Sequence, residues 1–251
     1  HAVMDGFNGF ASNCAFIWTM PTTKPYGGFQ SGRRFNFDNE DTRIIREHIE
    51  GLELCSPELQ LGGWRGGNNV NYNGKTAAFS IYGAEPEVIQ VEAVLVKQGR
   101  FLNKQDLNEE RKICVIGKEV LNLLFGKEDP MGKYIRINGV YFKVVGVMAK
   151  KGSAQMGDNP DAKIYVPFTT FQKAFNSLNQ VHWFNVVAKP GVEVSKMEKE
   201  IKLLLARRHR VDPNDENAFG SFNLQEIYTM MNMLFVVIAG ELAGIISIAD
   251  Q

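Results

Sequence analysis

The amino-acid sequence predicts an α+β fold, a split ferredoxin-like sandwich of β-α-β units into which a second, mainly β lobe is inserted. The prediction depends on two β-α-β patterns, at residues 14–61 and 182–224, because a ferredoxin-like sandwich is made of two such units. Between them stand two Asn-Gly pairs, at 73–74 and 138–139, which are typical of two-residue hairpin turns. The stretch between the two units therefore has strands of its own; the first Asn-Gly pair precedes the inserted lobe and the second lies within it.

The first unit begins with the apolar run CAFIWTM at residues 14–20, which predicts a strand, and a loop rich in Gly and Pro follows. A helix comes next, and Asp38 or Asn39 is expected to cap its N-terminus. Its buried face is expected to hold Ile44, Ile45 and Ile49. Residues 52–61 then form the second strand.

The second unit repeats this order. A strand is predicted at residues 182–190, a helix at 195–208 and a returning strand at 219–224. Ser195 and Glu198 have the spacing of a capping box at the start of this helix. The apolar face of the helix consists of Met197, Ile201, Leu204 and Leu205.

The inserted lobe contains a hairpin, KYIRINGVYFKVVGV at residues 133–147, with a type I′ turn at Asn138 and Gly139. Because side chains alternate along a strand, one face is buried and the other is solvated. The buried face consists of Ile135, Ile137, Val140, Phe142 and Val144. The solvated face consists of Tyr134, Arg136, Tyr141 and Lys143. A short helix at residues 118–126 has an apolar face of Val120, Leu121, Leu124 and Phe125.

These patterns divide the chain into two lobes. Residues 1–90 together with 160–227 form the split α+β lobe, and residues 91–159 form the inserted lobe. The stretches 85–95 and 150–163 would then join the lobes, and the second of them is rich in Gly, Pro and Asp. We expect hinge motion between the lobes at these two stretches.

Residues 228–251 are expected to be the start of a membrane helix. From residue 228 to residue 249 the segment is mainly apolar and has one charged residue, Glu241. Its 22 residues are close to the roughly 20 that span a bilayer. The alternative is an amphipathic or core helix, which Gly240 and Gly244 also fit.

The composition excludes some partners. The chain has 28 basic and 28 acidic residues and no block of Lys and Arg, so nucleic acid is not an expected partner. Cys14, Cys55 and Cys114 lie far apart without a C-x-x-C pair, which indicates buried thiols. The sequence is also compatible with one disulfide between two of them. The chain opens with His1 and shows no signal-type segment, so we expect a fragment or a processed form of a longer protein.

No catalytic, cofactor-binding or metal-binding residue is predicted. The sequence has no G-x-x-x-x-G-K-[ST], H-E-x-x-H or G-x-S-x-G motif, so we expect neither an enzyme nor a cofactor. The four histidines His1, His48, His182 and His209 do not have metal-ligand spacing, and His48 is expected to pack on its helix.

Two charged stretches have a simple structural interpretation. Residues 207–210, RRHR, are cations at the end of a helix, where the helix dipole favours them, and the alternative is a docking patch for an acidic partner. The acidic loops at 158–161 and 212–216 lack the ligand spacing of a calcium loop and are interpreted as turns and caps.

A run of motifs between Gly99 and Gly152 resembles the periplasmic core domain of MacB-type permeases, within the FtsX-like permease superfamily. The motifs are Gly99-Arg100-Phe101 with Asp106, Val115-Ile116-Gly117, Leu124-Phe125-Gly126, Pro130-Met131-Gly132-Lys133 and Val144-Val145-Gly146-Val147. The similarity continues through residues 164–175, 206–219 and 239–247, so it covers nearly the whole chain. Glu241 departs from the family pattern, which is uncharged there.

The resemblance implies a non-catalytic extracytoplasmic domain of an inner-membrane ABC transporter permease, lying in the periplasm. Its split α+β lobe would be the porter-like lobe. It would transmit ATP-driven movement to the periplasm and dock an adaptor or cargo for export. The implied partners are an ABC ATPase subunit or domain, a second permease subunit, a periplasmic adaptor and an outer-membrane channel. Export, lipoprotein release and control of cell-wall enzymes all stay open.

Two other classes of function are weighed against this one. A stand-alone ligand-binding or receptor ectodomain would hold its ligand between the lobes, in a deep aromatic pocket rather than an exposed cleft. A hydrolase would need a nucleophile and a base, for which the sequence has no local motif.

Overall fold

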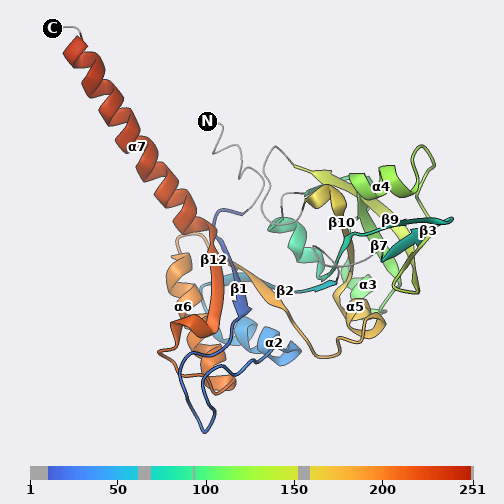
Figure 1. Cartoon of the computed structure of the whole chain (residues 1–251), viewed down its shortest axis with the longest axis horizontal. Coiled ribbons are helices and arrows are strands. Elements are labelled where there is room, and N and C mark those ends of the chain that lie inside the picture. Colours follow the sequence, from blue (N-terminus) through green and yellow to red (C-terminus); the bar gives the residue numbers. More distant parts are fainter. Residues whose placement is uncertain (1–10, 62–68, 93, 152–158, 250–251) are drawn as a thin grey trace.

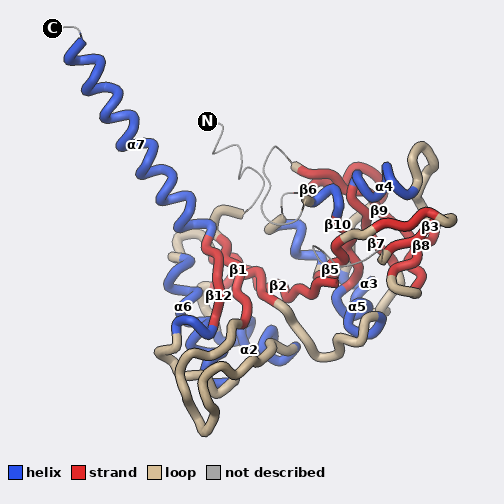
Figure 2. Tube along the Cα trace, in the orientation of Figure 1, coloured by secondary structure: helices blue, strands red, loops and turns tan. Residues whose placement is uncertain are grey.

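The strands of the molecule form one mixed sheet that extends from β12 (Phe219–Asn223) at one end to β4 (Lys75–Ala77) at the other, with helices packed along it (Figures 1 and 2). This is a computed structural model, and it describes residues 11–61, 69–92, 94–151 and 159–249, with side chains described as far as residue 237. Most strand pairs are antiparallel, and two pairs are parallel. The expected α+β class is confirmed.

The porter-like lobe contains the two predicted β-α-β units. Its elements are β1 (Cys14–Thr19), α2 (Asn39–His48), β2 (Leu52–Leu61), β11 (Trp183–Ala188), α6 (Val194–Arg208), η3 (Glu216–Ala218) and β12. The strand order β12-β1-β11-β2 interleaves the strands of the two units, as a ferredoxin-like sheet does. The fully buried side chains of Ile17, Phe184 and Val186 lie on the face that α2 and α6 cover.

The second lobe continues the same sheet. Its strands are β3 (Val70–Tyr72), β4, β5 (Ser80–Ala84), β6 (Val94–Gly99), β7 (Ile113–Gly117), β8 (Tyr134–Ile137), β9 (Val140–Lys150) and β10 (Lys163–Pro167). Its helices are η1 (Pro86–Gln90), α3 (Lys104–Asn108), α4 (Lys118–Leu124), η2 (Pro160–Ala162) and α5 (Phe168–Ala174). The strand order is β5-β10-β7-β9-β8-β3-β4, and β6 pairs with β9.

Strand pairing divides the lobes differently from the boundaries expected at residues 90 and 160. β3 and β4 lie within residues 1–90, yet β3 pairs with β8, and Tyr72 of β3 packs on Phe125 of the insert with 4.2 Å between the ring centroids. β10 lies within residues 160–227, yet it stands between β5 and β7. The second lobe therefore extends from β3 to α5.

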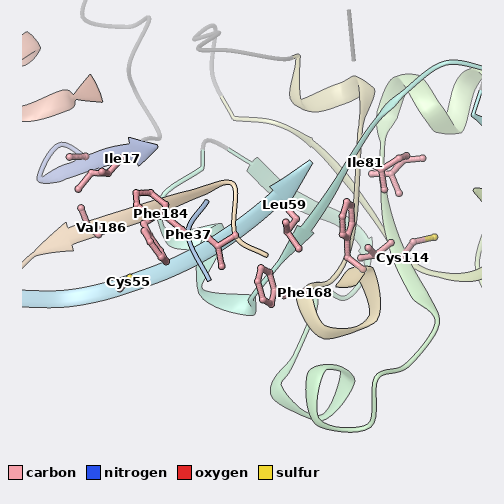
Figure 3. Close-up of a cluster of buried hydrophobic side chains, with 14 of the residues drawn as sticks. Ile17, Phe37, Cys55, Leu59, Ile81, Cys114, Phe168, Phe184 and Val186 are labelled. Atoms are coloured by element: carbon pink, nitrogen blue, oxygen red, sulfur yellow. The ribbon is translucent and has the colours of Figure 1, made fainter. Parts of the chain in front are cut away.

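The stretches expected as hinges, 85–95 and 150–163, consequently lie within the second lobe. Among the described residues, the chain passes from the porter-like lobe to the second lobe along β2 and returns through residues 175–182. β2 pairs with β11 over its first part and with β5 over its last part, and Glu58 has a partner in both strands. Leu59 and Phe168 lie between the apolar side chains of the two lobes, so one hydrophobic cluster crosses the junction (Figure 3).

The two predicted helix caps have different outcomes. Asp38 caps α2 in a capping box with Asp41, as the sequence predicts for one of its two candidates. The capping box predicted at Ser195 and Glu198 is wrong, because α6 begins one residue earlier and both side chains make tertiary contacts instead. The Ser195 hydroxyl donates to Glu226, and Glu198 accepts from Asn223 Nδ2 at 3.3 Å.

The hairpin prediction in the insert is confirmed. β8 and β9 pair in register across Asn138 and Gly139, whose φ angles of 45° and 87° are the positive values that a type I′ turn requires. The predicted inner face is buried except for Val140, which is partly buried. The predicted outer face is exposed, with Tyr134 and Tyr141 more than half accessible.

The chain ends in α7 (Leu224–Ala249), which projects away from the porter-like lobe (Figure 1). No helix among the described residues has both the length and the apolar character needed to cross a membrane. The expectation that residues 228–251 begin a membrane helix stays a prediction, and the Glu241 side chain lies outside the described part of the chain.

Candidate functional site at the junction of the two lobes

A buried polar cluster lies where β2 changes its pairing partner. Glu58 is fully buried at this point, and its Oε2 atom accepts hydrogen bonds from Trp183 Nε1 at 2.8 Å and Asn185 Nδ2 at 2.6 Å. β2 supplies Glu58 and β11 supplies both donors, because Trp183 and Asn185 occupy alternate positions and share one face of that strand. This face is opposite the one that α2 and α6 cover.

A buried ion pair adjoins Glu58. Lys163 Nζ, at the start of β10, lies 3.0 Å from Glu92 Oε2, and the two side chains are only 4% and 9% exposed. The ammonium also lies 4.6 Å from the centre of the Tyr82 ring. Removing both charges from water is costly, so such a pair is retained only where each partner compensates the other. The pair therefore holds β10 against the segment that follows η1.

The protonation of Glu58 reflects these surroundings. Burial, and next the Glu92 carboxylate, raise the pKa of Glu58 to about 8, while Asn185, Lys163 and Trp183 act in the opposite direction. Burial and the same two carboxyl groups raise the pKa of Tyr165 well above its usual value. The cluster contains two carboxyl groups and one ammonium, so it is electrically balanced when Glu58 is neutral.

Two open cavities lie along β2, where α2 faces the second lobe. One has a volume of about 440 Å³ and is bounded by η1 and α3, and the other, of about 380 Å³, is bounded by α5. An ion pair between Arg46 and Glu85 stands between them. Phe168 is the aromatic side chain in their walls, so neither is the deep aromatic pocket expected of a ligand-binding ectodomain.

The base of α7 is fixed to the porter-like lobe. Gln225 Oε1 accepts from the Val194 amide at 2.8 Å, and Ser195 Oγ donates to Glu226 Oε1 at 2.6 Å, so the start of α7 is joined to the start of α6. Leu224 is fully buried in an apolar cluster with Val91, one residue before Glu92. A movement of α7 would therefore act on both α6 and the segment that carries Glu92.

The RRHR stretch and His182 make structural contacts. Arg208 donates to Asp38 at 2.9 Å and to Asp41 at 2.8 Å, and the His209 ring lies 2.8 Å from Asp41. These residues tie the end of α6 to the cap of α2, which is a more specific role than the predicted dipole interaction. His48 is exposed rather than packed, and the His182 ring accepts from the Gln60 amide.

The remaining candidate ligands do not converge. Asp215 accepts from the amides of Thr23 and Lys24, as expected of a turn residue, and Asp161 accepts from the Lys150 amide. Asp158 and His1 lie outside the described residues. Within the described part of the chain, no three His, Cys, Asp or Glu side chains are placed to hold a metal ion.

The cysteines behave as predicted. All three are buried free thiols, and burial is the main factor that raises the pKa of Cys14 and of Cys55 to about 12 and that of Cys114 further above its usual range.

Two of the family-like motifs, Gly99-Arg100-Phe101 with Asp106 and Val144-Val145-Gly146-Val147, are explained by packing. Arg100 binds the fully buried Asp106 through two hydrogen bonds of 2.6 and 2.9 Å. Gly146 lies against the Arg100 carbonyl, where a β-carbon would collide with the oxygen. The motif residues therefore hold β6, α3 and β9 together.

Two solved structures share this fold. The periplasmic region of MacB from Actinobacillus actinomycetemcomitans matches with a TM-score of 0.70 at 18% identity, over 92% of this chain and 98% of that one. The extracellular domain of the ABC-type transporter YknZ from Gram-positive bacteria matches with a TM-score of 0.67 at 20% identity, over 84% and 100%. The fold is thus that of extracytoplasmic domains of ABC-type transporters.

Sequence comparison makes the assignment more specific. The family model of the MacB-like periplasmic core domain matches residues 4–204, so the chain belongs to this family. The macrolide export ATP-binding/permease protein MacB of Bdellovibrio bacteriovorus is 28% identical over 221 residues, and that of Marinobacter nauticus is 30% identical over 194. These alignments cover 88% and 75% of this chain but only 33% and 29% of the relatives, so the chain spans about a third of their length.

Proposed function

We propose that the chain is the extracytoplasmic domain of a MacB-type ABC transporter permease and that it transmits movement of membrane helices into the periplasm. The observation that carries the proposal is the attachment of α7, whose first turn is hydrogen-bonded to α6 and packed on Val91. The domain itself is non-catalytic in this proposal, and a partner ATPase supplies the energy.

The surface of α7 supports a membrane connection. Its described part carries large apolar side chains that are exposed to solvent: Met230, Met233, Leu234, Phe235, Val236 and Val237. A contiguous exposed apolar surface marks a contact with lipid or with another protein. In the proposal, α7 continues into the inner membrane and the two lobes lie in the periplasm.

The continuous sheet supports transmission beyond the first lobe. β2 is paired with both β11 and β5, and the hydrophobic cluster crosses the junction without a break in the described residues. Force applied through α7 to α6 and β12 would therefore reach the second lobe through packed strands rather than through a loose linker.

The names of two relatives support an ABC ATPase among the partners. The Bdellovibrio and Marinobacter proteins are described as ATP-binding/permease proteins for macrolide export. We infer an ABC ATPase subunit or domain for this chain, a second permease subunit, and a periplasmic adaptor with an outer-membrane channel as the route of export. Docking of the adaptor or the cargo is assigned to the two lobes.

Crosslinking of the lobes tests the proposal in the full-length transporter. Arg43 and Thr169 line the same cavity from α2 and α5, so Arg43→Cys and Thr169→Cys can be joined by a short bis-maleimide after the three native cysteines are replaced. We expect the crosslink to abolish macrolide tolerance of cells that depend on the transporter, while each single variant treated with the reagent keeps it. Full tolerance with complete crosslinking would show that the lobes dock partners passively.

A further inference from the structure

The cluster at the junction contains polar atoms that the packing leaves unsatisfied. Ser56 Oγ, Glu58 Oε1 and Asn185 Oδ1 are buried and have no hydrogen-bond partner among the described residues. Ser56 and Asn185 are opposite each other in the β2–β11 register, and Asn185 contacts Glu58. Buried polar atoms are normally paired, and a group of unpaired ones in a native core requires an explanation.

The position of the cluster suggests that explanation. Glu58 is the residue of β2 that pairs with both β11 and β5, so it lies where the sheet passes from one lobe to the other. Lys163 belongs to β10 of the second lobe. Glu92 follows Val91, which packs on Cys14 and Val187 of the porter-like sheet. The Lys163–Glu92 pair therefore belongs to the second lobe and lies where that lobe meets Glu58 and the porter-like sheet.

We propose that Glu58, Glu92 and Lys163 form a proton-dependent latch between the two lobes. When Glu58 is protonated, the cluster is charge-balanced and the lobes keep the arrangement seen in Figure 1. When Glu58 loses its proton, a second carboxylate is buried beside Glu92, and the junction opens to hydrate it.

The surroundings of the cluster set the direction of the pH dependence. The titratable and charged groups around Glu58 and Glu92 are Lys163 and Tyr165 on β10, Tyr82 on β5 and Cys14 on β1. Burial favours the neutral form of Glu58, and so does the Glu92 carboxylate. Opening therefore releases a proton, and an increase in pH favours the open state.

The latch is also placed to respond to α7. Leu224 and Val91 belong to one buried cluster, and Tyr228 packs against it. A shift of α7 would displace Val91 and with it the neighbouring Glu92. This last step rests on the proposed function, whereas the latch itself is a property of the domain and is tested without transport.

Hydrogen exchange of the chain tests the latch. The measured quantity is the equilibrium constant for opening of the amides in β2, β5 and β11, obtained after correction for the intrinsic exchange rate. In the wild-type protein this constant should rise about tenfold per pH unit between about pH 6 and 8. In Glu58→Gln it should be independent of pH, because the amide cannot ionise. Glu53→Gln, an exposed position on the same strand, should behave as the wild type. An equal pH dependence in Glu58→Gln and wild type would overturn the proposal.

A second measurement needs no variant. Carbon-13 NMR of glutamate-labelled wild-type chain should show one carboxyl group that titrates well above the others. If every glutamate carboxyl titrates below about pH 6, the latch is excluded even where Glu58→Gln does not fold. Loss of transport in the crosslinked transporter, together with a pH-independent junction, would retain the proposed function and remove the latch.

Discussion

The two faces of β2 differ in chemistry although their residues alternate along one strand. Cys55 and Leu59 face the apolar cluster that crosses the junction, whereas Ser56 and Glu58 face Asn185 and the Lys163–Glu92 pair. Both faces are fully buried. Apolar packing depends on shape and is insensitive to pH, whereas a buried carboxyl group stabilises the fold in one protonation state only. The stability of the junction is thus insensitive to pH on the apolar face and dependent on pH on the polar face.

The largest effect is expected from Lys163→Met, which leaves Glu92 buried without its partner. Breaking a buried ion pair in this way costs about 3–5 kcal/mol of unfolding free energy, measured by urea denaturation of the chain. The double variant Lys163→Met/Glu92→Leu removes both charges and should recover most of the loss. A loss below about 1 kcal/mol in the single variant would mean that the pair is hydrated in solution and that the polar face is not a closed core.

Leu59→Ala changes the opposite face of the same strand. The side chain is fully buried at the centre of the apolar cluster, so its truncation should cost about 2–5 kcal/mol. The thiols and the tyrosine of that cluster have raised pKa values and do not ionise between pH 5 and pH 8, so the loss should be the same at both. A loss that varies strongly with pH would show that the two faces are coupled.

Glu58→Gln tests whether the polar face makes the unfolding free energy depend on pH. The folded-state pKa of Glu58 is raised above its usual value, so its contribution is fully present below about pH 4.5 and is lost as the pH rises toward about 8. Relative to the glutamine variant, the wild type should lose about 1.4 kcal/mol per pH unit in that window. Denaturation curves at several pH values measure this difference, and parallel profiles for the two proteins would contradict it.

The smallest effect is expected from Ser56→Ala. The hydroxyl is buried without a partner, so its removal should be neutral or stabilise the chain by up to about 1 kcal/mol. Cys55→Ala, its neighbour on the apolar face, should instead lose about 1 kcal/mol because it leaves a small cavity. If both variants destabilise equally, Ser56 makes a hydrogen bond in solution.

Local patterns predicted much of the fold. The period of two in the hairpin identified its buried and solvated faces, and Asn138-Gly139 predicted the turn, because both depend on neighbouring residues only. The capping prediction succeeded at Asp38, where the partner is three residues away. It failed at Ser195, because the competing partner Glu226 belongs to another helix.

The sequence by itself determined the α+β class, the two β-α-β units, the buried thiols and the family. Only the tertiary structure decided where one lobe ends and which charges meet. Glu58, Glu92 and Lys163 are far apart along the chain, and in the sequence each is an ordinary charged residue. The strand pattern at 52–61 contains two acidic residues, Glu53 and Glu58, and does not by itself distinguish the buried one from the exposed one. These three residues meet because β2 pairs first with β11 and then with β5, and because β10 lies beside β5. Strand order between such distant segments is set by packing rather than by local propensity.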